Sequence, residues 1–453
     1  MLHRFTINGY HLVLDANSGA LHLVDGLVYD LLGEYPPADR RELVARFSRF
    51  YPREQVEEAL AELEQLEGEG LLFSPDPLED ACRVPQERGL KALCLNVAHD
   101  CNLACRYCFA GQGNFGGEAG LMPLEVGQKA IDFLLTASGP RRRVEVDFFG
   151  GEPLLNLPVL KELVAYGREK AEALGKHIKF TVTTNALLLN PDVAAYLNEQ
   201  DMAVVLSIDG RPQVHDAMRV FPGGGGSYRY VLENVKRFVA TRPQGEYYIR
   251  GTFTRHNLDF ARDVLHLADL GFKKISLEPV VACGAADYAL RPEDVPAVCA
   301  EYEELARLLV ERSRAGEPFE FFHFNIDLEG GPCLVRRLWG CGAGVEYLAV
   351  TPGGDLYPCH QFVGRPEFCL GHVAEGITRR DLVEQFKAAH VYNKEPCRQC
   401  WARFFCGGGC HANAHAYAGS IMQPPEIFCA LVKKRIECAL YVRAALSGVP
   451  DNA

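Results

Sequence analysis

Strand and helix patterns alternate six times between residues 88 and 315, and this alternation restricts the fold more than any other feature of the sequence. Short apolar runs predict the strands, and amphipathic segments between them predict the helices. Strands that alternate with helices form a parallel sheet, either open or curved into part of a barrel, and such sheets bind ligands at the carboxyl ends of their strands. The predicted strands are Leu90–Val97, Val144–Phe149, Lys179–Thr184, Ala203–Ile208, Tyr247–Thr254 and Lys274–Val280.

Two regions outside this alternation have different patterns. In the first 80 residues, Phe5–Leu14 and Ala20–Val24 predict a β-hairpin, and two helical patterns follow it. From about residue 330 onward, glycine and cysteine dominate, and only Arg379–His390 and Phe428–Leu446 predict helices. Such a region builds little hydrophobic core, so we expect metal centres to hold its shape. The predicted domains are residues 1–80, 88–315 and 330–453.

The charge and the N-terminal sequence narrow the class of protein. The chain has 59 acidic and 47 basic residues, for a net charge of −12, which leaves no overall positive field for nucleic acid. Its N-terminus lacks the basic segment, apolar stretch and cleavage site of a signal peptide. No window offers the ~18 consecutive apolar residues of a membrane span. We therefore expect a cytoplasmic protein with neither a nucleic acid nor a membrane as its partner.

The 17 cysteines of this 453-residue chain are unevenly distributed. None precedes Cys82, one tight group lies between residues 101 and 108, and most of the others follow residue 330. Disulfides are disfavoured in the reducing cytosol, so clustered cysteines there more often bind metal or take part in catalysis.

The first cysteine group consists of Cys101, Cys105 and Cys108, in a loop directly after the first predicted strand. Three thiolates at the spacing C-x3-C-x2-C can face one point in space. With only three protein ligands, one iron of a [4Fe–4S] cluster is left to bind another molecule. Because Cys-x2-Cys is also a common zinc half-site, a zinc ion is the alternative, although a suitable fourth ligand is lacking nearby.

This group, with the aromatic Tyr107 before its last cysteine, resembles the signature of the radical S-adenosylmethionine (SAM) enzymes. Its place after the first strand agrees with the partial (β/α)6 barrel of that family. The resemblance implies that SAM chelates the open iron through its amino and carboxylate groups. One-electron reduction would then cleave SAM to a 5′-deoxyadenosyl radical, which abstracts a hydrogen atom. It also implies catalytic roles for the three cysteines and an electron donor such as a flavodoxin or ferredoxin.

Three further segments at strand ends agree with this resemblance. The sequence Phe149-Gly150-Gly151-Glu152-Pro153 resembles the GGE motif that contacts the SAM amino group, and its glycines let the backbone approach a ligand closely. The third and fourth strands end in Thr183-Thr184-Asn185 and Ser207-Ile208-Asp209-Gly210, and Arg219 follows. Plain turns at the glycines and Asn185, and a surface ion pair of Arg219, are the alternatives. The SAM contacts implied by the resemblance are Gly150, Gly151, Glu152, Asn185, Ser207 and Arg219.

Seven later cysteines have a layout that resembles the SPASM domain, which holds auxiliary [4Fe–4S] clusters in radical SAM enzymes that modify peptides. Three clusters are therefore expected in total, and a zinc array is the alternative. Cys333 is a candidate fourth ligand of the first auxiliary cluster. If Cys333 does not ligate, a substrate thiolate could bind the open iron. The resemblance assigns Cys341, Cys359 and Cys410 to the first auxiliary cluster and Cys397, Cys400, Cys406 and Cys429 to the second.

Six cysteines lie outside both motifs, and we expect them to be buried thiols without a metal. They are Cys82, Cys94, Cys283, Cys299, Cys369 and Cys438.

Residues 1–80 resemble a winged-helix-like peptide-recognition module, in which a leader peptide adds a strand to the edge of the hairpin. A nucleic-acid-binding winged helix is disfavoured because the module is acidic.

Over its whole length the chain resembles the SCIFF peptide maturases. These radical SAM/SPASM enzymes install a thioether link between a cysteine sulfur and an acceptor-residue carbon in a short Cys-rich ribosomal precursor peptide. The segments Gly331-Pro332-Cys333, Cys341-Gly342-Ala343-Gly344 and Cys406-Gly407-Gly408-Gly409-Cys410-His411 carry this resemblance. Alternatives with the same core are formylglycine formation in a sulfatase and carbon–carbon peptide cross-linking. A peptide-binding electron carrier or zinc scaffold would be the non-enzymatic alternative.

Overall fold

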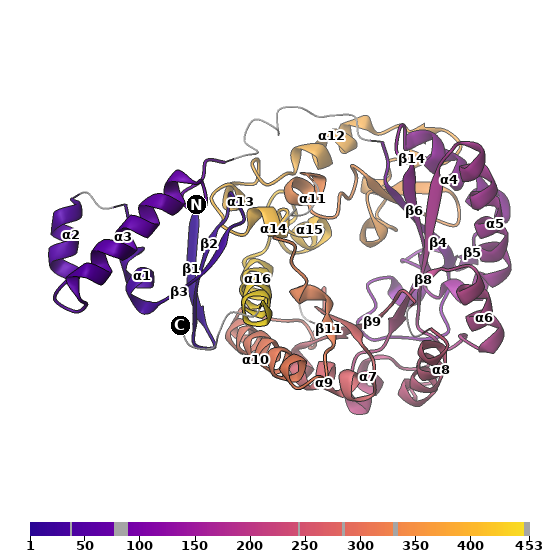
Figure 1. Ribbon diagram of the computed structural model, residues 1–453. Coiled ribbons are helices and arrows are strands. Elements are labelled where there is room, and N and C mark those ends of the chain that lie inside the picture. Colours follow the sequence, from indigo (N-terminus) through magenta and orange to yellow (C-terminus); the bar gives the residue numbers. More distant parts are fainter. Residues whose placement is uncertain (37–38, 77–88, 243–244, 283–285, 329–333, 448–453) are drawn as a thin grey trace.

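The computed structural model describes residues 1–36, 39–76, 89–242, 245–282, 286–328 and 334–447, and a curved parallel sheet forms its centre (Figure 1). Six strands lie side by side in the order of the sequence, as the alternating pattern predicts. Their side chains are mostly buried, because helices cover the outer face of the sheet. The six strands are β4 (Ala92–His99), β6 (Arg143–Gly150), β7 (His177–Thr184), β8 (Ala203–Ser207), β9 (Tyr247–Phe253) and β10 (Lys274–Pro279).

The helices that cover this sheet follow the strands in the chain. Between consecutive strands the connection passes through one or two helices, which is the arrangement of an α/β barrel that does not close. The fold class predicted from the sequence is therefore confirmed. The helices are α4 (Leu124–Ala137), α5 (Leu157–Ala173), α6 (Pro191–Glu199), α7 (Pro212–Met218), α8 (Tyr228–Ala240), α9 (Ala261–Asp269) and α10 (Val295–Arg314).

The C-terminal region continues the same sheet. Strand β12 (Tyr347–Val350) pairs in parallel with β4, at the edge opposite β10. Side chains on β12 are almost fully buried and belong to the core of the barrel. The helix α16 (Glu426–Leu446) packs along α10, at the other side of the opening. The expectation that the C-terminal region builds little hydrophobic core is therefore wrong, because this region shares the core of the barrel.

The remaining C-terminal elements are short. The sheet extends beyond β12 through antiparallel β13 (Asp355–Tyr357), β14 (Gly371–His372) and β15 (Gly376–Ile377), while β11 (Glu320–Phe321) and β5 (Gly120–Leu121) are short additional strands. Five short helices lie between the barrel and α16. Four of them were not expected from the sequence, because four to eight residues are too few for an amphipathic pattern. The helices are α11 (Leu334–Trp339), α12 (Arg380–Ala388), α13 (Glu395–Arg398), α14 (Arg403–Cys406) and α15 (His411–Ala418), of which only α12 was predicted.

The N-terminal module is a three-stranded antiparallel sheet followed by helices, rather than the two-stranded hairpin expected. The expected strand over Phe5–Leu14 is interrupted at Asn8 and Gly9, whose φ angles are 49° and 83°. Two positive φ angles are the mark of a type I′ hairpin turn, for which Asn-Gly is the preferred pair. The elements are β1 (Leu2–Ile7), β2 (Tyr10–Asp15), β3 (Leu21–Val24), α1 (Gly26–Leu31), α2 (Arg40–Phe47) and α3 (Arg53–Gly68).

This module has its own small core and docks on the C-terminal region. The His3 ring of β1 stacks on Trp401, with 3.7 Å between the ring centroids, and its Nε2 lies 2.9 Å from Oε1 of Glu437. The buried Arg403 guanidinium donates to Asp76 at 2.7 Å, in the segment that leaves the module. In the part of the chain that the structure describes, no helix has the length and apolar character needed to cross a membrane.

Candidate functional site

A cavity of about 1650 Å³ opens at the carboxyl ends of the parallel strands. Residues at the ends of β6, β7, β8 and β10 line it on one side, and residues of α15, α16 and the loops of the C-terminal region line it on the other. This is the position at which parallel α/β sheets bind their ligands.

The first cysteine group lies in the loop after β4, and all three thiols line the cavity. Backbone hydrogen bonds from Ala104 N to Val220 O and from Arg106 N to Met218 O, both 2.8 Å, fix this loop. Burial raises the pKa of Cys101 to about 12 and that of Cys105 to about 11, and the neighbouring thiols of the group add to this shift. The structure thus brings together the three thiols that the sequence motif groups.

Two glycines at the end of β6 are required by the close approach of this loop. Gly151 donates its N–H to Ala98 O at 2.8 Å, and a Cβ added to Gly151 would lie 2.2 Å from Asp100 O. Gly150 has a φ of 132°, and a Cβ there would lie 2.2 Å from Ala98 O. Both glycines line the cavity, so their backbone faces the predicted SAM site.

We expect Gly151→Ala to displace the loop that carries Cys101. The added Cβ would overlap the backbone of Asp100, the residue that precedes Cys101. A misplacement of about 1 Å in a reacting group costs on the order of 100-fold in rate, so 5′-deoxyadenosine formation should fall by about that factor. Iron content measured alongside should stay near that of the unmodified chain, because all three thiols are retained. Gly117→Ala is the control, since an added Cβ there meets nothing closer than 3.6 Å. Equal activity of both variants would contradict this role of Gly151.

The carboxylate of Glu152 is occupied within the protein. It is fully buried and accepts hydrogen bonds from Leu154 N at 3.0 Å, Thr184 Oγ1 at 2.8 Å and Asn185 N at 2.8 Å. Burial raises the pKa of Glu152 to about 7. Glu152 is not among the residues that line the cavity in the described part of the chain, so its side chain ties the end of β6 to the end of β7.

The other predicted SAM contacts line the cavity. The Asn185 side chain donates to Asn102 Oδ1 at 2.7 Å, next to Cys101. Ser207 ends β8. Arg219 donates from Nε to Oδ1 of the fully buried Asp209 at 3.0 Å, and its guanidinium lies 5.5 Å from the centre of the Tyr107 ring. The ion pair of Arg219 is therefore a buried one, and not the surface pair considered as an alternative.

The later cysteines form two groups in the structure. The thiols of Cys341, Cys359 and Cys410 act on one another electrostatically, and burial raises the pKa of each, to about 11 for Cys410. In the second group burial raises the pKa of Cys397 to about 12, and Cys406, Cys429 and Cys400 also act on it. These are the two sets that the resemblance implies, and their role as ligands stays a prediction.

The cysteines outside the motifs have different environments. Cys94 and Cys438 are buried, whereas Cys299 and Cys369 are partly buried. Cys82, Cys283 and Cys333 lie outside the described residues, so the prediction that Cys333 is a fourth ligand stays untested.

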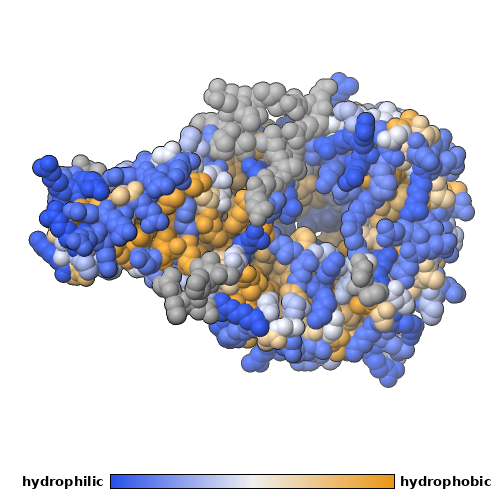
Figure 2. All heavy atoms as spheres, in the orientation of Figure 1, coloured by the Kyte–Doolittle hydropathy of each residue, from blue (hydrophilic) through white to orange (hydrophobic). Residues whose placement is uncertain are grey.

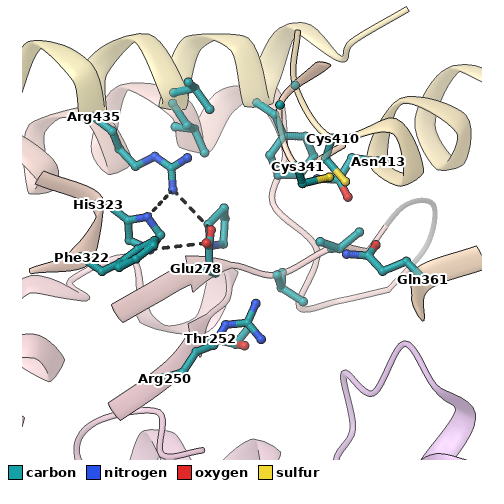
Figure 3. Close-up of a pocket in the computed structure, with 18 of the residues that line it drawn as sticks. Arg250, Thr252, Glu278, Phe322, His323, Cys341, Gln361, Cys410, Asn413 and Arg435 are labelled. Atoms are coloured by element: carbon teal, nitrogen blue, oxygen red, sulfur yellow. Dashed lines mark hydrogen bonds and ion pairs between the residues drawn. The ribbon is translucent and has the colours of Figure 1, made fainter. Parts of the chain in front are cut away.

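Four side chains that the sequence did not single out meet in the same cavity (Figure 3). Arg435 of α16 donates from Nη1 to Glu278 Oε2 at 3.3 Å and to His323 Nδ1 at 3.2 Å. Burial lowers the pKa of His323 to about 4, so its Nδ1 is free to accept. Arg250 of β9 points into the cavity below this group. Of these four residues, only Glu278 could have been expected in the cavity from the sequence, because it lies near the end of the sixth predicted strand.

The fold resembles two solved structures. It matches anSMEcpe with bound AdoMet and Kp18Cys peptide with a TM-score of 0.65 and 21% identity, over 79% of this chain and 99% of that chain. It matches Streptococcus suis SuiB bound to S-adenosylmethionine with a TM-score of 0.54 and 15% identity, over 94% of this chain and 98% of that chain. The second match covers more of this chain than residues 88–453 could supply, so it includes part of the N-terminal module.

Two family models match the regions that contain the cysteine groups. Residues 88–232 match a 4Fe-4S single cluster domain, and residues 341–401 match SPASM, an iron-sulfur cluster-binding domain. The fold and these matches define an iron–sulfur protein built on a parallel α/β barrel.

Two relatives match the chain over most of their own length. The chain is 30% identical to the uncharacterized protein MJ0907 of Methanocaldococcus jannaschii, over 63% of this chain and 89% of the relative. It is 29% identical to the mycofactocin maturase MftC of Mycobacterium ulcerans, over 76% of this chain and 89% of the relative. The chain belongs to the radical SAM family whose members carry a SPASM domain.

This family binds SAM and [4Fe–4S] clusters, and the residues present fit these groups. Each of the three groups supplies three or four cysteine thiols, which are the donors that iron–sulfur clusters take. Among the described residues, no three His, Cys, Asp or Glu side chains converge on a site for a single metal ion.

Proposed function

We propose that this chain is a peptide maturase that installs a thioether cross-link, as the SCIFF peptide maturases do. The link would join a cysteine sulfur to an acceptor-residue carbon in a short, Cys-rich ribosomal precursor peptide. In this proposal residues 1–80 bind the precursor, residues 88–315 bind SAM, and residues 330–453 hold two auxiliary clusters. An external donor such as a flavodoxin or ferredoxin would supply electrons.

The observation that carries this proposal is the shared cavity. Cys101, Cys105 and Cys108 line the same cavity as Cys341 and Cys410 of the first auxiliary group. Its volume of about 1650 Å³ exceeds the ~300–1,000 Å³ of ordinary small-molecule sites, so a peptide segment has room beside SAM. A substrate cysteine near the first auxiliary group would then face an acceptor carbon near SAM.

When bound and reduced, SAM supplies the radical that takes a hydrogen atom from the acceptor carbon. The residues of the chain orient the reactants. Asp209 fixes the Arg219 guanidinium beside Tyr107, so this cation can hold the SAM carboxylate without reorganising.

Glu278 presents a carboxylate to the cavity, in an ion pair with Arg435. Burial acts to raise its pKa, but the basic groups of His323, Arg435 and Arg250 outweigh burial and hold the pKa below its usual range. The carboxylate is therefore ionised at neutral pH, and it lines the cavity.

The N-terminal module offers an open strand edge for the precursor. Among the described residues, β3 pairs only with β2, whereas β1, the opposite edge strand, packs against α16. Figure 2 shows apolar surface in the area that β1–β3 occupy in Figure 1. An unpaired edge beside apolar side chains such as Leu21 and Leu23 supports strand addition by a leader peptide.

We expect the precursor peptide to protect the backbone amides of β3 from hydrogen exchange, because its leader would hydrogen-bond to that edge. Amides of Leu21–Val24 should exchange at least about tenfold more slowly, while those of β1 should not change. Exchange followed by mass spectrometry measures this, with the same peptide lacking its leader as the control. If the peptide without its leader protects these amides as well as the full precursor does, the proposed role of β3 is contradicted.

Mass spectrometry of the product tests the proposed reaction itself. A Cys-rich precursor peptide is incubated anaerobically with reconstituted enzyme, SAM and reductant, and is then alkylated. Loss of two hydrogens together with one fewer alkylated thiol is the expected result. An unchanged peptide with 5′-deoxyadenosine release would reject the thioether reaction in favour of sulfatase or carbon–carbon chemistry. Absence of SAM cleavage would point to an electron carrier.

A further inference from the structure

Lys394 is a cation buried completely within the C-terminal region. Its side chain is 0% exposed, and its Nζ donates one hydrogen bond, at 2.9 Å, to the carbonyl oxygen of Gly408. Among the residues that the structure describes, Lys394 forms no ion pair with an Asp or Glu carboxylate. A buried ammonium without an opposite charge is strongly unfavourable, so Lys394 keeps its charge only where a negative group compensates it.

The groups around Lys394 are thiols from both predicted auxiliary clusters. Burial lowers the pKa of Lys394, whereas Cys397 and Cys406 of one group, and Cys410 and Cys341 of the other, act in the opposite direction. His390 and His411 also lie beside it. An imidazole does not supply a negative charge, so the sulfur atoms are the available negative groups.

The chain between the two cysteine groups passes beside this ammonium. Gly407, Gly408 and Gly409, which join Cys406 to Cys410, have φ angles of 69°, 88° and 76°. A Cβ added to Gly408 would lie 3.5 Å from the Lys394 Nζ. Because this short segment connects a ligand of one predicted cluster to a ligand of the other, Lys394 lies between the two.

We propose that Lys394 is the charge-compensating residue of both auxiliary clusters and raises their reduction potentials. The inference rests on the proposed assignment of the cysteines as ligands. A thiolate-bound cluster gains a negative charge on reduction, and a nearby buried cation stabilises that charge, since net charge and hydrogen bonding set cluster potentials. Lys394 is thus a positioning residue that acts on electron uptake and does not touch the peptide.

Redox titration of the full, reconstituted chain, followed by electron paramagnetic resonance, tests this proposal. Lys394→Met removes the charge but keeps the length of the side chain. We expect at least one auxiliary cluster to become about tenfold harder to reduce, a shift of ~59 mV to more negative potential. Lys394→Arg should retain the potential. Lys387→Met, which removes a surface cation paired with Glu384, should also retain it.

Unchanged potentials in Lys394→Met, with its clusters intact, would overturn the proposal. If Lys394→Met fails to hold auxiliary iron while Lys394→Arg holds it, the requirement for a charge is supported. Loss of iron from both variants would assign Lys394 to packing and overturn the proposal. The iron content of the unmodified chain tests the assignment of the cysteines separately. If the later cysteines bind no auxiliary clusters, the unmodified chain contains the iron of the first cluster alone.

Discussion

Replacing Cys101 with alanine is expected to abolish SAM cleavage. Cys101 lines the cavity with Cys105 and Cys108, and two thiols cannot replace three as ligands of the cluster that would bind SAM. Release of 5′-deoxyadenosine should fall to the background of the assay, which means a loss of at least about 1,000-fold, as expected when an essential cofactor ligand is removed. The measurement is chromatography of an anaerobic reaction containing SAM and reductant.

Cys94→Ala is the matched control for this experiment. Cys94 lies on β4, seven residues before Cys101, and it is buried in the core of the barrel away from the motif. Its substitution removes a small apolar group, so we expect a modest loss of stability with SAM cleavage retained. Cleavage at the unmodified rate by Cys101→Ala would show that the first cysteine group is not the SAM site.

Replacing Cys410 with alanine is expected to abolish cross-linking but not SAM cleavage. Cys410 is the N-cap residue of α15 and interacts with Cys341 in the first auxiliary group, on the side of the cavity that the C-terminal region forms. Loss of the first auxiliary group would remove the proposed binding site of the substrate thiol. The loop after β4, which carries Cys101, keeps its own contacts, so SAM cleavage should continue. Product should fall by at least about 100-fold, consistent with the cost of misplacing a reacting group.

The ratio of cross-linked peptide to 5′-deoxyadenosine measures this separation of roles. Cys369→Ala is the control, because Cys369 lies in the same region, donates weakly to Gly371 O at 3.6 Å and is outside the predicted ligand set. If Cys410→Ala makes product at the unmodified ratio, the first auxiliary group is not needed for the bond-forming step.

The barrel was predictable because its signals are local. Buried parallel strands have continuous apolar sequences, and the predicted strands agree with β4, β6, β7, β8, β9 and β10 to within two residues at most ends. The turn at Asn8-Gly9 was equally local, but the expected strand over Phe5–Leu14 overlooked it. Short helices such as α14 and α15 left no pattern, because tertiary packing rather than an amphipathic face stabilises them.

The candidate site was predictable where a motif lies within one loop. The spacing of Cys101, Cys105 and Cys108 predicted one thiol group, and the structure brings those thiols together. The contacts of Glu152 could not be predicted from its motif. Its carboxylate accepts hydrogen bonds from Thr184 and Asn185, which lie at the end of a different strand. Lys394 had no sequence signal, since burial of a lysine depends on everything packed around it.

By itself, the sequence determined the parallel barrel and the first cysteine group, because apolar runs and the C-x3-C-x2-C spacing act over a few residues. The membership of the two later cysteine groups came from the family resemblance. Only the tertiary structure decided that these groups share one cavity. That depends on β12 pairing with β4, more than 250 residues earlier in the chain, and on α16 packing along α10. It also decided that Arg435 of α16 meets Glu278 of β10. Contacts over such separations come from the closing of the whole core, for which no local pattern exists.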